Sequence, residues 1–336
     1  MRKFIVLLAV CFSVNLFSQD DLFIGQTRFM QKSNASYFGF NSLNRVGVMY
    51  NSYQFNSTQN IDNKYFFGAL SFDEKNFSLG LDFNSLRIQN SGLTSNLANF
   101  SYVYKVQINN NLFFLPAVTA GLGNSTFNVS TLVFEDQLDR STGYISTETT
   151  DPLANRLVQV SYMDLGASLI IHNERLLLGL SLKHLNRPNV SFDQGAENRK
   201  QISITTNAAY EFNLNPFDRG LLPRYTYLLT YAHYTMQGKS RLLNLSQEIQ
   251  LAEFAFGVNQ QISFFDGFNL SQVGMSAGIS FDNFEFGVLY NFPIRNINKT
   301  FAASVFELYL TFDFSKFRRN RRGLYKRLQN DNYFSL

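Results

Sequence analysis

The sequence is poor in the residues that most enzyme and metal sites require. Its 336 residues include one cysteine and three histidines, and tryptophan is absent. The cysteine, Cys11, lies in the apolar run of the first 18 residues, which have the charged start and short apolar core of a bacterial secretory signal peptide. Cleavage near Ser18 leaves a mature chain without cysteine, and this excludes disulfides and cysteine chemistry.

The three histidines form no recognisable metal or catalytic pattern. His172, His184 and His233 each fall in or at the end of a predicted strand, and no His-x-x-His or His-Glu-x-x-His spacing occurs. We therefore expect no metal, no cofactor and no catalytic residue, and a binding or transport component rather than an enzyme. A hydrolase that pairs His184 with Ser181, or His233 with a distant serine, stays open as an alternative, although serine is also common inside a wet lumen.

Long apolar runs are also missing after the signal peptide. No segment approaches the roughly eighteen uninterrupted apolar residues that a transmembrane helix needs. Phenylalanine and tyrosine are nevertheless abundant, at 36 and 17 residues, while the mean hydropathy is −0.13. The apolar residues must therefore be dispersed among polar ones, as they are in strands that alternate between an apolar and a polar face.

This alternation is visible from about residue 45 onward, in segments of roughly ten residues. Between Phe284 and Phe292, every second residue is apolar, and Glu285, Gly287 and Asn291 occupy the opposite face. Residues 77–84 and 306–314 repeat the pattern. One oily face and one face of Gly, Ser, Asn and scattered charges indicate strands between lipid and a wet lumen, and explain more than a large soluble β sandwich does.

The fold class that we predict is all-β, a transmembrane antiparallel barrel of about 14 strands. Short turns alternate with long connections at 128–155 and 186–199, as expected for periplasmic turns and extracellular loops. The predicted organisation is a signal peptide at 1–18, an N-terminal plug or periplasmic segment at 19–44, the outer-membrane barrel at 45–314 and a basic tail at 315–336. The predicted strands are 45–55, 65–72, 77–87, 97–107, 112–127, 157–172, 175–185, 200–212, 224–235, 240–250, 252–264, 268–282, 284–293 and 302–314.

The positive charge of the chain is local to its ends. Subtracting the +6 of the tail and the +2 of the signal peptide from the total of +4 leaves −4 for the body. The charge therefore does not indicate a nucleic-acid partner. The tail is either a solvated basic terminus or a periplasmic docking segment for acidic protein or lipid. Its candidate docking residues are Lys316, Arg318, Arg319, Arg321, Arg322, Lys326 and Arg327.

A specific motif lies in the middle of the chain: an Asp-x-Gly strand, a short turn, and then Gly-x-Ser-x-x-His-Leu-x-x-Pro. With this motif the chain resembles the PorP/SprF family, outer-membrane proteins of the type IX secretion system. Residues 34–39 are similar to an early Asn-Pro-Ala/Ser-aromatic-x-Gly stretch of the family, with Ala35 in place of the proline, and residues 45–55 resemble its first strand. The motif positions, which also have an ordinary structural explanation, are Asp164, Gly166, Gly179, Ser181, His184, Leu185 and Pro188.

The resemblance implies a role in protein secretion. A member of this family helps a secreted cargo to reach the cell surface beside a separate giant translocon. The cargo is typically a large adhesin used in gliding motility or a similar protein with a C-terminal sorting domain. Contacts with the periplasmic ring of the same machinery and with outer-membrane lipid are also implied, and no family-wide catalytic residues come with the resemblance.

Physical size limits what such a barrel does. About fourteen strands enclose a lumen that side chains or a small ligand fill, far too narrow for a folded adhesin. We therefore predict a receptor or adaptor rather than the conduit, with its binding surface in the loops 128–155 and 186–199, or in the N-terminal segment and the basic tail. The competing hypothesis is a small-solute channel similar to the long-chain fatty-acid transporters.

Overall fold

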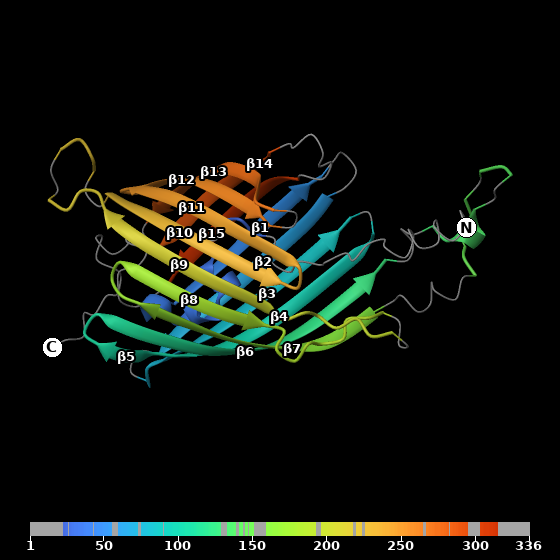
Figure 1. The fold of residues 1–336 in the computed structure, drawn as a ribbon, viewed down its shortest axis with the longest axis horizontal. Coiled ribbons are helices and arrows are strands. Elements are labelled where there is room, and N and C mark those ends of the chain that lie inside the picture. Colours follow the sequence, from blue (N-terminus) through green and yellow to red (C-terminus); the bar gives the residue numbers. More distant parts are fainter. Residues whose placement is uncertain are drawn as a thin grey trace.

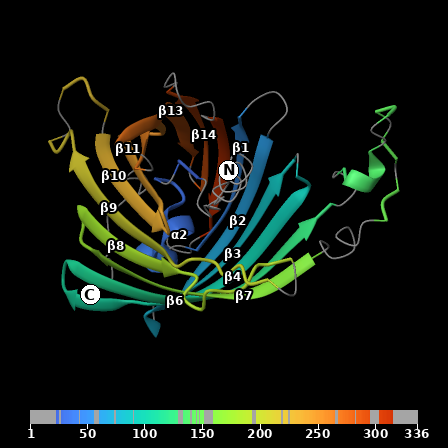
Figure 2. The same cartoon turned by 45° about the vertical axis from the view of Figure 1, so that its right-hand side comes forward.

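The chain folds into a closed barrel of antiparallel strands around a short inner segment (Figures 1 and 2). The signal peptide predicted for residues 1–18 and the basic tail at 315–336 lie outside the described residues. The computed structural model describes residues 23–314 except 26, 43, 56–59, 73–74, 90, 129–132, 139–140, 144, 147, 151–158, 193–195, 218–219, 224–225, 265–266, 282 and 295–302.

Each strand pairs with its neighbours in sequence, except that β4 pairs with β6 instead of β5, and β1 pairs with β15. The helical elements are α2 (Met30–Ser33), η1 (Ala35–Ser42) and η4 (Glu135–Gln137). The strands are β1 (Arg45–Gln54), β2 (Asn60–Phe72), β3 (Phe77–Ile88), β4 (Leu93–Tyr104), β5 (Val106–Asn109), β6 (Leu112–Phe127), β7 (Gln159–His172), β8 (Leu176–Lys183), β9 (Ser203–Asn213), β10 (Thr226–Gln237), β11 (Ser240–Leu251), β12 (Phe254–Ser263), β13 (Asn269–Phe281), β14 (Phe284–Pro293) and β15 (Ser304–Asp313).

The predicted number of strands is confirmed. β4 and β5 both pair with β6 and are separated only at Lys105, so together they fill one position in the barrel. The fifteen elements therefore make fourteen positions, and the β4–β6 pairing joins the two edges of the sheet. Closure leaves no edge strand with unpaired backbone groups, which a sheet surrounded by lipid requires. Within the described residues, no helix combines the length and the apolar character of a membrane-crossing helix.

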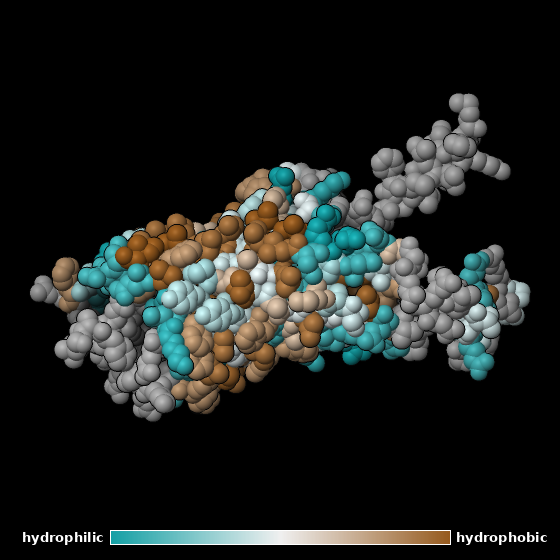
Figure 3. Space-filling model, turned by 90° about the horizontal axis from the view of Figure 1, so that it is seen from below, coloured by the Kyte–Doolittle hydropathy of each residue, from teal (hydrophilic) through white to brown (hydrophobic). Residues whose placement is uncertain are grey.

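The two faces of the strands have the polarity of a membrane barrel. On β14, Phe284, Phe286 and Phe292 are about half exposed, whereas Glu285 and Asn291 are buried. Figure 3 shows brown side chains spread over the body of the barrel, with teal side chains gathered toward both ends. Apolar outside and polar inside is the reverse of a soluble protein, because here the outer face meets hydrocarbon.

The described residues of the segment 23–42 lie inside the barrel, and we call them the plug (Figure 2). Phe29 is 1% exposed and packs edge-on against Phe67, Tyr65 and Tyr309, with ring centroids 5.4 to 6.1 Å apart. Phe38 lies against Gly80 of β3, where a Cβ atom would collide with its ring. Aromatic packing between the plug and the wall therefore forms the main apolar core of the molecule.

The two ends of the barrel differ in their connections. β1 begins and β15 ends at the same end, where the turns between β2 and β3, β7 and β8, and β13 and β14 are also short. We call the opposite end the outer end, because it carries the long connections 128–158 and 184–202. Figures 1 and 2 place η4 beyond this outer end.

Candidate functional site

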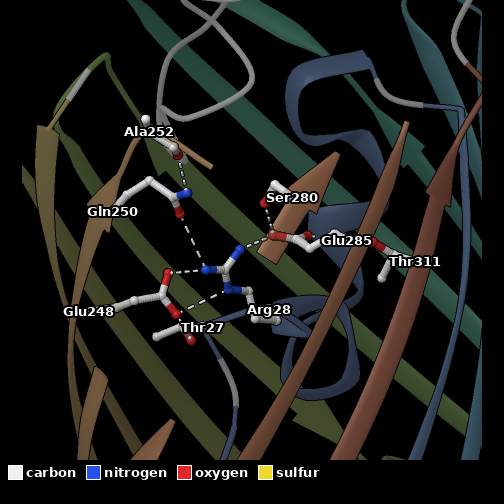
Figure 4. A network of polar contacts seen from close by, with 8 residues as sticks. All are labelled: Thr27, Arg28, Glu248, Gln250, Ala252, Ser280, Glu285 and Thr311. Atoms are coloured by element: carbon white, nitrogen blue, oxygen red, sulfur yellow. Dashed lines mark hydrogen bonds and ion pairs between the residues drawn. The ribbon is translucent and has the colours of Figure 1, made fainter. Parts of the chain in front are cut away.

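One side of the plug is attached to the wall by a buried arginine (Figure 4). The side chain of Arg28 is 3% exposed and lies between Glu248 of β11 and Glu285 of β14. Its Nη2 lies 2.6 Å from Glu248 Oε1, and its Nε donates to the other Glu248 oxygen at 3.0 Å. Its Nη1 pairs with Glu285, and Nη2 also reaches Gln250. This two-pronged geometry is the strongest kind of ion pair available to a side chain.

A third carboxylate holds the start of the plug without a cation. Glu307 of β15 is 1% exposed and accepts hydrogen bonds from the backbone N–H groups of Ile24 and Gly25, both at 2.7 Å. The Nδ2 of Asn51 donates a third, at 2.6 Å. Three donors compensate much of the cost of burying this carboxylate.

On the opposite side the plug meets β7, β8 and β9 mainly through neutral groups, with one ammonium, that of Lys183, donating to the Lys32 carbonyl at 2.8 Å. The Nδ2 of Asn34 donates to the carbonyls of Leu169 and Leu180 at 3.2 and 3.3 Å, and its Oδ1 accepts from the N–H of Ser36. This contact requires glycine at position 179, because a Cβ atom there would lie 2.7 Å from Asn34 Nδ2. The motif residue Gly179 therefore makes room for a plug residue.

The rest of the motif gathers near the outer end of β7 and β8. His184 Nδ1 lies 2.9 Å from Asp164 Oδ1, and both side chains are buried. His184 has a φ of 59°, a left-handed conformation that is uncommon outside glycine, so its contact with Asp164 stabilises a strained turn. The next N–H, of Leu185, donates to Leu165 at 2.9 Å and fixes the chain leaving β8.

The remaining motif positions have supporting contacts. Gly166 lies opposite the Leu182 carbonyl, which would be 3.1 Å from a Cβ atom. Ser181 is buried and pairs across the strands with Ser168, which in turn bonds Ser36 of the plug. Leu185 is exposed, and the carbonyl of Pro188 accepts a hydrogen bond from Lys200.

The other two histidines have partners of their own. His233 Nε2 lies 2.7 Å from Thr235 Oγ1 and its Nδ1 lies 3.0 Å from Asn207 Nδ2. His172 stacks on Phe113 and meets Phe40 of the plug edge-on. In the described part of the chain, no three His, Cys, Asp or Glu residues are grouped so as to hold a metal ion.

A polar cavity lies between the plug and the outer half of the wall, and we call it the outer cavity. The motif residues Asp164, Gly166, Ser181 and His184 form part of its lining. Its floor is made by Gln31, Lys32 and Ala35 of the plug. Its volume, counted over the positions open to the centre of a water molecule, is about 80 Å³.

The loop that follows β6 is ordered around one aspartate. The Asp136 carboxylate accepts hydrogen bonds from the Thr149 hydroxyl and from the N–H and hydroxyl of Thr150, at 2.6 to 3.2 Å. The Thr150 N–H, followed by the threonine hydroxyls, lowers the pKa of Asp136 below its ordinary value. Nearby, Leu138 and Ile145 form an antiparallel bridge, yet both are about half exposed.

The sequence patterns did not single out the residues that attach the plug. Arg28 lies in a segment without alternation, and the alternating pattern does not distinguish the three glutamates from other residues of the polar face. The sequence nevertheless contains a signal for the attachment sites. Glu248, Glu285 and Glu307 all fall on the polar, lumen-facing side of strands whose other side is apolar. Carboxylates in such positions require cations or several donors, and the segment preceding the barrel is a place to look for them.

Comparison with known proteins gives a family match over most of the chain. Residues 18–312 match the family described as type IX secretion system membrane protein PorP/SprF. No curated protein matches the chain. Among solved structures, the Acinetobacter baumannii outer-membrane protein Omp33 is 8% identical with a TM-score of 0.44, covering 82% of this chain and all of its own. A deletion mutant of TodX, a monoaromatic hydrocarbon channel, is 10% identical with a TM-score of 0.48, covering 83% and 94%.

Proposed function

The chain belongs to the PorP/SprF family of type IX secretion system membrane proteins, and on that premise we propose that it is an adaptor that binds one secreted surface protein and brings it to the translocon. The protein is an outer-membrane β-barrel. The cargo that we propose carries a C-terminal sorting domain and acts at the cell surface, as an adhesin does.

The filled lumen is the observation that carries this proposal. The plug packs aromatic side chains against the wall and is attached to it by Arg28 and Glu307. No folded protein passes through a fourteen-strand barrel, and the outer cavity beside the plug, at about 80 Å³, is far smaller than any folded protein. The surfaces available for a protein partner are therefore the two ends of the barrel.

The loop at residues 128–155 is the part of the outer end best suited to bind protein. Its sequence contains five acidic residues and one basic residue, a net charge of −4. Val133, Leu138 and Ile145 expose between 46% and 52% of their surface in this loop. Exposed apolar side chains within a charged rim are typical of protein interfaces. We therefore propose that this acidic loop contacts a surface of the cargo that is basic and apolar.

The periplasmic end supplies the second contact in this proposal. The basic residues of the tail, beginning at Lys316, follow directly after β15, which ends beside the short turns. We propose that they meet an acidic surface of the translocon or of the periplasmic ring. Replacing the seven basic residues by glutamine should weaken co-purification of these components, and a matched change of the tail's uncharged residues should not.

Deletion of the gene tests the proposed function directly. Surface and culture-fluid proteins of the deletion strain are compared quantitatively with those of the parent. The expected result is the loss of one large surface protein and its accumulation inside the cell, while other exported proteins stay at parental levels. An unchanged exported set would reject the adaptor role, and an altered uptake of small solutes would favour the channel hypothesis in its place.

A loop variant separates binding from folding. Changing Val133, Leu138 and Ile145 together to serine should reduce delivery of the cargo while the barrel still folds and resists denaturation by detergent. A matched control changes Val118, Leu122 and Met163, which are at least as exposed on the lipid face, to alanine. Equal delivery by the loop variant and the wild type would place the cargo site elsewhere.

A further inference from the structure

One connection at the periplasmic end of the barrel differs from the others in length and polarity. The turns between β2 and β3, β7 and β8, β11 and β12, and β13 and β14 contain two to four residues, nearly all polar. The connection between β9 and β10 spans residues 214–225, and we call it the β9–β10 loop. Figure 1 shows its described residues projecting from the end of the barrel opposite η4. Such a length is unusual at an end where the turns are normally short.

The described residues of this loop expose large apolar side chains. Leu221 is fully exposed, Phe217 is 79% exposed and Leu222 is 43% exposed. β9 and β10 contain 11 and 12 residues, and about 9–11 residues suffice for a tilted strand to cross the hydrocarbon. The loop therefore begins at the level of the lipid headgroups. Exposed leucine and phenylalanine side chains at this level indicate an interaction surface.

Hydrogen bonds hold these side chains in a fixed arrangement. The Nδ2 of Asn215 donates to the carbonyls of Leu222 and Pro223, at 3.1 and 3.3 Å, and so joins the two sides of the loop. The N–H of Leu214 donates to the Thr226 carbonyl at 3.0 Å and continues the pairing of the two strands. The loop therefore needs little further ordering to present its apolar side chains to a partner.

The returning side of the loop lies over the lipid-facing surface of β10. Thr226 shares a face of this strand with Leu228 and Thr230, because side chains alternate along a strand, and this face points away from the lumen. Thr226 is nevertheless fully buried, and its hydroxyl donates to the Pro223 carbonyl at 2.7 Å. The chain that precedes β10 thus covers the outer side of the strand rather than the lumen.

The lipid-facing surface of β9 also continues into the loop. Tyr210, Phe212 and Leu214 follow one another at every second position, and all three are exposed. The rings of Tyr210 and Phe212 lie 4.5 Å apart, near the strand end, where aromatic side chains of membrane barrels meet the headgroups. The exposed apolar surface formed by Phe217 and Leu221 follows directly along the chain. An interface with lipid is therefore continuous from the wall to the loop.

We propose that the β9–β10 loop inserts Phe217, Leu221 and Leu222 into the periplasmic leaflet of the outer membrane and anchors this side of the barrel there. Apolar side chains that start at the level of the headgroups gain free energy by moving below them, as the apolar faces of interfacial segments do. The proposal does not rest on the adaptor role, because no contact with cargo or translocon enters the argument.

Tryptophan fluorescence tests this proposal, because the chain contains no tryptophan of its own. The barrel carrying Leu221→Trp is reconstituted into phosphatidylcholine vesicles with and without bromine on the acyl chains, since bromine quenches a tryptophan that it contacts. We expect a blue-shifted emission and strong quenching, greater with bromine near the headgroup than with bromine near the end of the chain. Phe217→Trp should give the same result from a second position.

Two further variants supply the controls. Leu122→Trp replaces a residue of β6 that is 71% exposed on the lipid face, and bromine deeper in the bilayer should quench it. Leu138→Trp, in the loop at the outer end, should emit as tryptophan does in water and should not be quenched. The gel shift between folded and unfolded barrel verifies that each variant is folded. If Leu221→Trp and Phe217→Trp both behave as Leu138→Trp does, the loop does not enter the membrane, and its apolar side chains are available to a periplasmic protein instead.

Discussion

The plug meets the barrel wall by ion pairs on one side and mainly by neutral groups on the other. On β11, β14 and β15 the contacts are made by three buried carboxylates and one arginine. On β7, β8 and β9 they are made by amides, hydroxyls and backbone carbonyls around Asn34, and by the ammonium of Lys183, which donates to the Lys32 carbonyl of the plug. Nearly all of these groups are buried, so the two sides differ mainly in the presence of ion pairs and not in exposure to water.

This difference determines how strongly each side resists opening. Removing one partner of a buried ion pair leaves a charge without compensation and costs about 3–5 kcal/mol. Removing a neutral hydrogen bond costs about 1 kcal/mol. The charged side therefore fixes the position of the plug, whereas the neutral side tolerates adjustment. The outer cavity borders β7 and β8 and thus lies on the more adjustable side.

The strongest test of this comparison is Arg28→Met. The variant leaves Glu248 and Glu285 buried without their cation, and we expect the free energy of unfolding to fall by about 3–5 kcal/mol. Unfolding in urea, followed by the gel shift between folded and unfolded barrel, measures the change. We also expect a higher ion conductance in planar bilayers, because the displaced plug no longer fills the lumen.

A second variant shows whether the uncompensated charges cause the loss of stability in Arg28→Met. Arg28→Met combined with Glu248→Gln and Glu285→Gln removes all three charges, and buried ion pairs replaced in this way are often no less stable than the original. Recovery of most of the lost stability is therefore expected. If the triple variant is as unstable as Arg28→Met, shape and not charge attaches this side of the plug.

On the neutral side, Gly179→Val tests the close approach of Asn34 to the wall. The new side chain occupies the place of the Asn34 amide, and overpacking of this kind costs about 1–3 kcal/mol. Thermal or urea unfolding of the barrel provides the measurement. Adding Asn34→Gly should restore part of the loss, since it removes the clashing group. If Gly179→Val lowers the free energy of unfolding by more than Arg28→Met does, the neutral side contributes more than the charged side to the attachment of the plug.

The sequence predicted the wall much better than it predicted the plug, for a physical reason. Each strand of the wall separates lipid from lumen, so polarity alternates with every residue, as in Phe284 to Phe292. The plug faces protein on all sides, and Phe29 and Phe38 there obey no period. The sequence therefore leaves two locations open for this segment, a plug or the periplasm, because only tertiary contacts decide between them.

The residues of the candidate site also divide into those that the sequence predicts and those that it does not. The motif made Asp164 and His184 recognisable, but their contact depends on a left-handed turn at His184 that no spacing reveals. The outer cavity also depends on Gln31, which a segment without strand pattern brings opposite β3. Residues supplied by one regular element are predictable, whereas a cavity assembled from the plug and five strands requires the fold itself.

Glu307→Gln probes the charged side where a carboxylate has donors but no cation. The amide keeps one oxygen for Ile24 and Asn51, but its NH2 group faces the N–H of Gly25, which loses its acceptor. We expect a loss of about 1–3 kcal/mol in the free energy of unfolding. The same change at Glu285, made alone, should cost more, because it unbalances the ion pair of Arg28. Equal losses would show that the arginine adds nothing to this side.

The smallest effect is expected outside the barrel, at Asp136. Hydrogen bonds from Thr150 and Thr149 lower its pKa, so its contribution to loop structure is complete above the ordinary aspartate pKa and is lost as pH falls through the lowered value. The NMR shift of the Thr150 amide should therefore titrate with a midpoint below that ordinary pKa, and Asp136→Asn should abolish the titration. Barrel unfolding should be unchanged in the variant, because this exposed carboxylate contacts only its own loop. A destabilised barrel would instead show that the loop also stabilises the plug, as a third point of attachment beside the two sides of the wall.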